Sequence, residues 1–207
     1  MLNFMPETPG LRERKKQRTR LEIERAALDL FEERGFDGTT IDDIAAAADI
    51  APRTFFHYFP SKEDVVLADY RIRLDQIVGA LKASTAGETP WPALRDAFLT
   101  VGADYEAERE ELLRRFRIIQ TTPSVAARNL LVQASWEDAL TDAVSEWLGL
   151  ADRDDIRPRL MAGAALAAMR ASLRRWLTDG GHSRLPDHIA SCFDLLGEGL
   201  GDIGHPE

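Results

Sequence analysis

Apolar residues recur along most of the chain at the three- and four-residue spacing of an amphipathic helix, and no stretch shows the alternation of a half-buried strand. Glycine, proline and small polar residues interrupt the pattern at residues 85–90, at Thr122-Pro123 and at Gly180-Gly181. The sequence therefore predicts an all-α fold. In the second part of the chain the expected helices cover about residues 62–84, 91–107, 110–121, 124–148, 156–177 and 186–200.

The stretch from Thr40 to Phe59 carries the sharpest local signals. Thr40 and Asp43 have the spacing of a capping box at the start of a short helix. Asp49 stands where a turn should fall and tolerates a left-handed backbone. Pro52 suits the first position of a second helix, which we expect to run to about Phe59. This is the layout of a helix-turn-helix, whose second helix enters the DNA major groove.

Residues 14–66 resemble the DNA-binding domain of TetR-family transcriptional regulators. The matching segments are LFEERGFDGTT, IDDIAAAADIAPRTFFHYF and PSKEDV, and Ser61 with Asp64 repeats the capping spacing in the last of them. The resemblance implies a helical ligand-binding and dimerisation domain behind the DNA reader. We therefore expect a flexible basic arm over residues 1–20 that runs into the first helix, a helix-turn-helix domain over 21–66, and a ligand-binding and dimerisation domain over 67–207.

Several positions depart from the family pattern. The family's phosphate-binding tyrosine maps onto Phe56, which has no hydroxyl, so this contact is not carried over. Lys62 matches the family's phosphate-contacting lysine. Arg53 can form a bidentate pair with guanine, although a solvated surface charge is the alternative. We expect Thr40, His57, Tyr58 and Lys62 to position the phosphates. The complete set of expected DNA-contacting residues is Thr40, Arg53, Thr54, His57, Tyr58, Lys62, Lys15, Lys16 and Arg18.

The charge of the chain changes this picture only in part. The 207 residues carry a net charge of −9, which is unusual for a DNA binder. Residues 1–20, however, hold six cations against two acids, a net charge of +4, so the remainder carries −13. A basic segment that leads into a helix attracts phosphates, and a solvated chain terminus is the alternative. We expect DNA affinity to depend on the site and on salt.

The last two expected helices indicate a dimer. The segment MAGAALAAMRASL, residues 161–173, is apolar or small nearly all round, which is typical of a helix buried on more than one side. We interpret both helices as half of a four-helix bundle completed by a second copy, with the ordinary core of a monomer as the alternative. The resemblance implies the same interface. The predicted interface residues are Ala164, Ala168, Ala171, Ile189, Phe193, Leu196 and Leu200. A two-fold dimer predicts a pseudo-palindromic operator.

A ligand pocket is implied by the resemblance alone. Its candidate lining on the middle helices is Phe98, Val101, Tyr105, Phe116, Ile119, Gln120, Leu131, Ser135, Trp136, Met161, Ala165 and Met169. Aromatic rings and methionines with a few polar groups suit a small, largely apolar organic effector. For any one of these residues, core packing is the alternative.

Catalysis finds little support. The four histidines lie outside any metal-binding spacing, and the chain has neither a glycine-rich phosphate loop nor a nucleophile elbow, so we predict no catalytic residue, metal or cofactor. The single Cys192 and the lack of a long apolar run lead us to expect a cytoplasmic protein. The predicted function is a homodimeric, sequence-specific DNA-binding repressor that responds to a ligand. A helical protein-interaction module with an HTH-shaped domain is the alternative, and an enzyme in the C-terminal domain is disfavoured.

Overall fold

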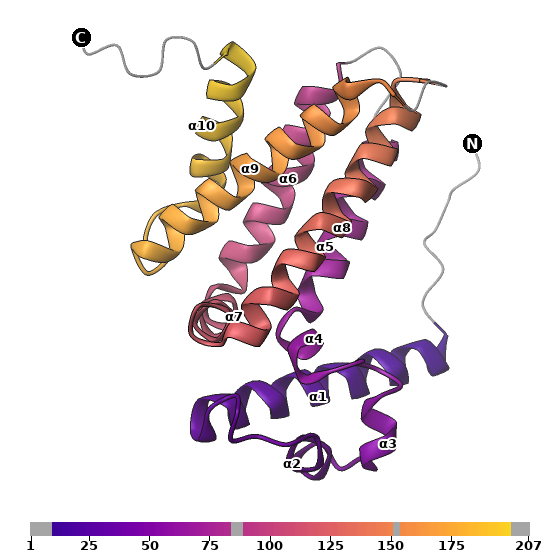
Figure 1. The fold of residues 1–207 in the computed structure, drawn as a ribbon, viewed down its shortest axis with the longest axis vertical. Coiled ribbons are helices and arrows are strands. Elements are labelled where there is room, and N and C mark those ends of the chain that lie inside the picture. Colours follow the sequence, from indigo (N-terminus) through magenta and orange to yellow (C-terminus); the bar gives the residue numbers. More distant parts are fainter. Residues whose placement is uncertain (1–9, 84–88, 151–153, 200–207) are drawn as a thin grey trace.

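The computed structural model describes residues 10–83, 89–150 and 154–199, and within them the chain forms ten helices and no strand. The predicted all-α fold is therefore confirmed. Four helices, α1 to α4, form a small domain at one end, and the other six form a bundle above it (Figure 1). Their bounds are α1 Leu11–Arg34, α2 Ile41–Ala47, α3 Pro52–Phe55, α4 Lys62–Val66, α5 Ala68–Ala83, α6 Pro90–Ala107, α7 Arg109–Thr121, α8 Pro123–Trp147, α9 Ile156–Thr178 and α10 Leu185–Glu198.

The local signals in the small domain are confirmed. Thr40 accepts a hydrogen bond from the Asp43 amide while the Asp43 carboxylate accepts one from Thr40, so the capping box is complete. Asp49 has φ of 53°, in the left-handed region, at the turn between α2 and α3. Pro52 is the first residue of α3. These devices turn α2 onto α3 and bury Ile44 and Phe55 in a common core.

Three features of the structure differ from the expected helix pattern. Helix α1 begins at Leu11, inside the segment expected as a basic arm that runs into the first helix, because residues 11–20 are mostly strong helix formers. Helix α3 ends at Phe55, and the amides of His57, Tyr58 and Phe59 then form tight turns back to the carbonyls of Thr54 and Phe55. The turns carry Phe59 into the core that holds Phe55.

The third difference is a break in the helix expected over 62–84. Leu67 separates α4 from α5, with φ of −97° and ψ of 12°. The Tyr70 amide consequently bonds to the Leu67 carbonyl instead of the Val66 carbonyl. The predicted helix end at Ser84 and the predicted interface residue Leu200 lie outside the described residues.

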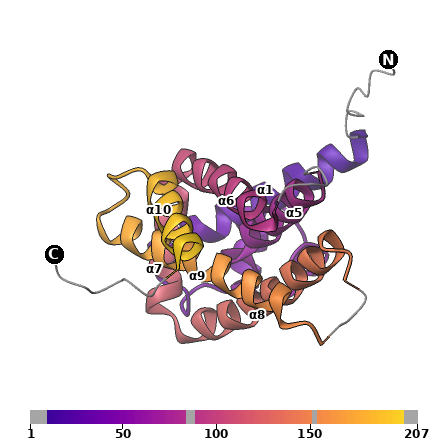
Figure 2. The same cartoon turned by 90° about the horizontal axis from the view of Figure 1, so that it is seen from above.

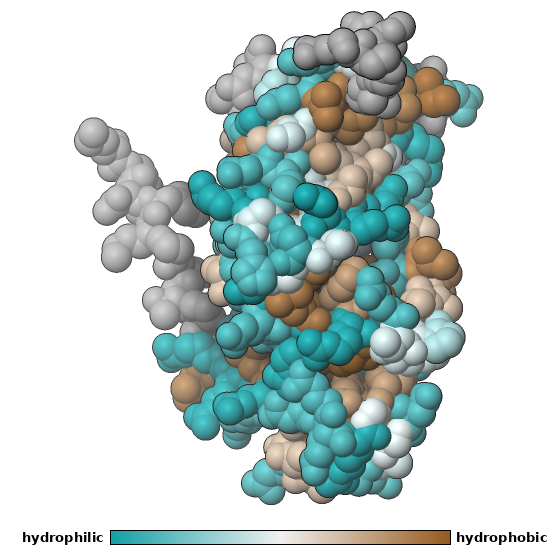
Figure 3. Space-filling view, turned by 90° about the vertical axis from the view of Figure 1, so that its left-hand side faces the viewer, coloured by the Kyte–Doolittle hydropathy of each residue, from teal (hydrophilic) through white to brown (hydrophobic). Residues whose placement is uncertain are grey.

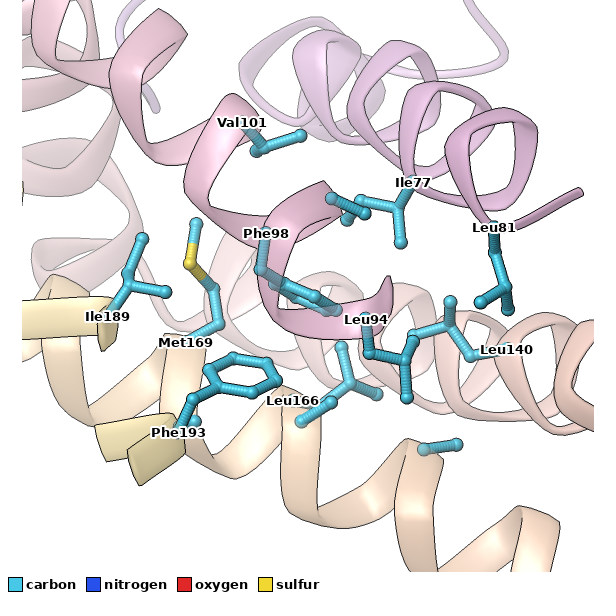
Figure 4. Close-up of a cluster of buried hydrophobic side chains, with 14 of the residues drawn as sticks. Ile77, Leu81, Leu94, Phe98, Val101, Leu140, Leu166, Met169, Ile189 and Phe193 are labelled. Atoms are coloured by element: carbon cyan, nitrogen blue, oxygen red, sulfur yellow. The ribbon is translucent and has the colours of Figure 1, made fainter. Parts of the chain in front are cut away.

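The larger domain packs α5, α6, α8, α9 and α10 around an apolar core. Viewed from above, α10 lies beside α6 and α9 (Figure 2). The rings of Phe98 and Phe193 lie 5.6 Å apart between their centroids in this core, with Met169 and Ile189 nearby (Figure 4). A Cβ atom added at Gly102 would overlap Ile189 Cδ1, so α6 and α10 approach each other closely there.

This packing corrects three predicted interface residues. Ile189 and Phe193 are fully buried in the core of their own chain, and Ala168 is 2% exposed. They cannot face a second copy, because the broad apolar face of α10 already covers α6 and α9. Among the described residues, no helix is both long and apolar enough to cross a membrane.

Candidate nucleic-acid interface and effector cavity

The helix-turn-helix leaves its expected DNA-reading side chains at the surface. Arg53 and His57 are exposed, one in α3 and one in the turns that follow it. Thr54 and Tyr58 are half-buried, and Thr40 is exposed at the N-cap of α2. Since Phe55 and Phe59 fill the core behind them, α3 and its following turns form a firm platform for these groups.

The basic first turns of α1 come next to that platform. Lys15 and Lys16 line one surface groove together with His57 and Tyr58. Arg18 lines a second groove together with Lys15 and Thr19, and its guanidinium pairs with Glu22 at 2.9 Å. Four of the predicted DNA contacts therefore lie on one surface, although the two pairs are more than 40 positions apart in the sequence.

Lys62 is placed differently from the other predicted contacts. Its ammonium donates to the carbonyls of Phe36 at 2.9 Å and Thr39 at 2.6 Å, and it lies 4.6 Å from the centroid of the Phe36 ring. Two of its three N–H groups are thus engaged within the domain. Lys62 ties the loop between α1 and α2 to the start of α4.

A cavity in the larger domain collects three of the predicted pocket residues. Tyr105, Trp136 and Met169 line it. The remaining lining residues, which the sequence did not single out, are Tyr70, Val132, Gln133, Leu166, Arg170 and Leu173. The cavity encloses only about 60 Å³, room for a few water molecules.

The other predicted pocket residues lie elsewhere. Phe98, Val101 and Ala165 are buried in close packing, and Met161 packs beside them at the core's edge. Ile119 is half-buried against the core of the small domain, and Phe116 is half-buried on α7. The exposed residues of the set are Gln120, Leu131 and Ser135. A helical pattern identifies an inward face, but it does not tell whether that face meets a cavity or a neighbouring helix.

Two tyrosines contribute hydroxyl groups to the cavity lining, which also includes Gln133 and Arg170. Burial raises the pKa of Tyr70 to about 12 and holds the pKa of Tyr105 well above its usual value, so both phenols stay neutral donors at physiological pH. Neither hydroxyl is hydrogen-bonded to another residue in the part of the chain that the structure describes. Both are therefore available to a ligand acceptor, next to the apolar side chains of Trp136, Leu166 and Met169.

The joint between the two domains depends on residues that sequence reasoning missed. Arg115 on α7 is 4% exposed and donates to the carbonyls of Val65 at 2.7 Å and Val66 at 3.1 Å. It also pairs with Glu24 of α1 at 2.9 Å. The Val66 carbonyl lost its helical partner at the break, so Arg115 replaces that partner.

A second arginine completes this joint. Arg20 of α1 donates to the Ala68 carbonyl at 3.0 Å and to Glu24 at 3.0 Å. Arg20, Glu24 and Arg115 thus form a chain of ion pairs that holds both sides of the break at Leu67. The sequence signal was an arginine on the inward face of α7, between Leu112 and Ile118.

Two families match the chain in successive segments. The family described as bacterial regulatory proteins, tetR family, matches residues 23–68, and the MftR C-terminal domain matches residues 88–201, more than half of the chain. The chain belongs to the TetR family of transcriptional regulators. TetR-family regulators bind DNA operators through this helix-turn-helix, and they are not enzymes.

Individual relatives agree with this assignment. TcmR of Streptomyces glaucescens, an HTH-type transcriptional regulator, is 35% identical and the match covers 83% of this chain and 78% of TcmR. MftR of Mycobacterium tuberculosis, named for mycofactocin biosynthesis, is 31% identical over 90% of this chain and 93% of its own. The crystal structure of FadR from Thermus thermophilus, a TetR-family repressor in complex with lauroyl-CoA, superposes with a TM-score of 0.59 at 28% identity, covering 91% and 98% of the two chains.

Phe56 offers a direct test of how this TetR-family reader meets DNA. Its ring is 56% exposed and lies edge-on against Phe55, so Phe56→Tyr should leave the fold intact. We expect the added hydroxyl to donate to an operator phosphate and to lower the Kd about fivefold, equivalent to about 1 kcal/mol. Fluorescence anisotropy with a labelled operator duplex measures the change. Ile72→Tyr, at an exposed position of α5, is the control. An unchanged Kd would show that position 56 does not face a phosphate.

Proposed function

We propose that this TetR-family protein is a homodimeric repressor that binds a pseudo-palindromic operator and is released by a small, largely apolar organic effector. The DNA-binding part of the proposal rests on the surface that combines exposed Arg53 with the groove of Lys15, Lys16, His57 and Tyr58. Arg53 is the candidate base reader, and the lysines are candidate phosphate contacts.

The outward face of α9 supports a dimer. Ile156 and Leu160 are 73% and 67% exposed, and Gly163, Ala164, Ala167 and Ala171 continue the same stripe of apolar and small residues. Exposed apolar patches of this kind mark interfaces, and small residues permit close helix packing. On the side of the molecule that carries α10, hydrophobic areas also lie between hydrophilic ones (Figure 3). The interface we propose keeps Ala164, Ala171 and Leu196 and adds Leu160, Ala167 and Leu195.

The proposed switch couples the cavity to the break at Leu67. A cavity of about 60 Å³ is far below the roughly 300–1,000 Å³ that ligand sites occupy, so an effector has to force its walls apart. One wall is Tyr70, three residues beyond Leu67 at the start of α5. Outward movement of α5 would shift α4 and change the spacing of the two readers in a dimer. The lauroyl-CoA bound by FadR carries a long apolar acyl chain, which supports an effector with a large apolar part.

Selection of bound sequences from random DNA, with the purified protein, tests the proposal. We expect an enriched pseudo-palindrome with half-sites about one turn of DNA or a multiple apart. Absence of an enriched sequence would favour the alternative, a helical module that binds a protein partner through an HTH-shaped domain.

The selected operator then permits a test of the base reader. We expect Arg53→Ala to raise the Kd about tenfold and to relax specificity at one base pair in each half-site, since a bidentate arginine contact discriminates by about 1–3 kcal/mol. Fluorescence anisotropy with single-base operator variants measures both effects. Arg25→Ala removes an exposed arginine from the middle of α1 as a control. Equal losses in the two variants would argue that Arg53 contributes only its charge.

A further inference from the structure

A groove separate from the cavity opens at the joint between the two domains. It lies where α4 sits between α1 and the adjoining ends of α5 and α8 (Figure 1). The groove holds about 330 Å³, which is within the size range of small-molecule sites, whereas the cavity beyond it holds about 60 Å³. Tyr70, Val132 and Trp136 line both spaces and form the wall between them.

The charges in the groove run against those of the whole protein. Arg20, Arg71 and Arg128 line it, against Asp64 as the one acidic lining residue. The chain as a whole carries −9. A local excess of cations in an acidic protein attracts small anions and concentrates them at this place. The adjoining lining is apolar and aromatic, with Tyr70, Leu74 and Trp136.

The three arginines differ in how firmly the protein already holds them. Arg20 is fixed by Glu24 and the Ala68 carbonyl. Arg128 donates twice to one oxygen of Asp64, at 2.9 and 2.8 Å, and its side chain is 41% exposed. Arg71 is exposed and forms no ion pair within the described residues. Arg71 therefore has free donors, and Arg128 can exchange Asp64 for another anion.

We infer that this inter-domain groove binds the anionic head of an amphipathic organic effector, with Arg71 and Arg128 as its charge partners and with Tyr70 and Trp136 against its apolar body. The inference deepens the proposed function and rests on it for the regulatory step. Asp64 also accepts from the Ser61 hydroxyl at 2.7 Å at the start of α4. An anion that draws Arg128 away from Asp64 would release α4 from α8.

Two probes with the same aromatic skeleton test the site in the purified full-length protein. Anilinonaphthalene sulfonate is anionic, and N-phenylnaphthylamine is its neutral counterpart. We expect Arg71→Gln and Arg128→Gln each to weaken the sulfonate about fivefold, as expected for a partly exposed ion pair, and to leave the neutral probe within about twofold. Fluorescence titration measures both affinities. Arg71→Gln removes an exposed side chain, so it remains informative if Arg128→Gln perturbs the fold.

Two further variants make the assignment specific. Arg117→Gln removes an exposed charge of α7 that does not line the groove, and Arg170→Gln removes the arginine at the cavity. Both should leave the sulfonate affinity unchanged. The inference would be overturned if the sulfonate did not bind, or if its affinity fell equally in Arg117→Gln or Arg170→Gln. It would also be overturned if the groove variants reduced the sulfonate affinity no more than the affinity of the neutral probe.

The regulatory step has its own measurement. If the probe lowers the affinity of the protein for operator duplex, thermodynamic linkage requires that saturating duplex lowers the affinity for the probe by the same factor. An operator that leaves the probe affinity unchanged would overturn the regulatory role of the groove. The titrations without DNA decide on the anion site itself, and failure of the site would leave operator selection unaffected.

Discussion

Arg115→Met is expected to lower the free energy of unfolding by about 3 kcal/mol, because breaking one side of a buried ion pair typically costs about 3–5 kcal/mol. Arg115 is 4% exposed and donates to Glu24 and to the carbonyls of Val65 and Val66. Methionine replaces the arginine side chain only as far as Nε, so both carbonyls lose their donor. Since Glu24 keeps Arg20 as a partner, we place the loss at the lower end of the range. Urea denaturation followed by circular dichroism measures it.

The neighbouring arginine on α7 supplies the matched control. Arg114 pairs with Asp29 and Glu32, both of which are largely exposed, so Arg114→Met should cost no more than about 1 kcal/mol. Adding Glu24→Gln to Arg115→Met should recover part of the loss, because it removes the carboxylate left with a single partner. Equal costs for Arg114→Met and Arg115→Met would mean that the joint at Leu67 does not depend on the buried arginine.

Local chemistry explains which features the sequence could predict. Three features each depend on residues within four positions of one another. They are the cap formed by Thr40 and Asp43, the left-handed Asp49 and the proline at the start of α3. Such features follow from side-chain hydrogen bonding and backbone sterics alone. They also carried the resemblance to the TetR family, which the comparisons confirm.

Features that depend on residues far apart in the chain could not be predicted from the sequence. The pattern of α10 marks Ile189 and Phe193 as apolar, but it does not tell whether α6 of the same chain or a second copy covers them. The break at Leu67 is stabilised by hydrogen bonds from Arg20 of α1 and Arg115 of α7, both of which are distant from Leu67 in the sequence. In the same way, Tyr70 lines the cavity because α5 packs against α8. The apolar periodicity of a single helix does not predict which helix it packs against.

The outward face of α9 leads to the prediction with the largest expected effect on DNA binding. Ala167→Arg is expected to turn the proposed dimer into a monomer at micromolar concentration and to weaken operator binding by about 100-fold or more. A second reader in the same molecule binds at a high effective concentration, and losing it commonly costs a factor of about 10²–10⁴. Analytical ultracentrifugation measures the oligomeric state, and fluorescence anisotropy measures the Kd.

Ala167 is suited to this test because it is exposed in the single chain, so arginine at this position disturbs a partner rather than the fold. Ala80→Arg makes the same change at an exposed position of α5, away from α9 and α10, and should remain dimeric with unchanged affinity. If Ala167→Arg stayed dimeric, the outward face of α9 would not be the interface. If it became monomeric yet kept full operator affinity, each chain would read DNA independently, and the pseudo-palindromic operator would no longer follow from the two-fold symmetry of the protein.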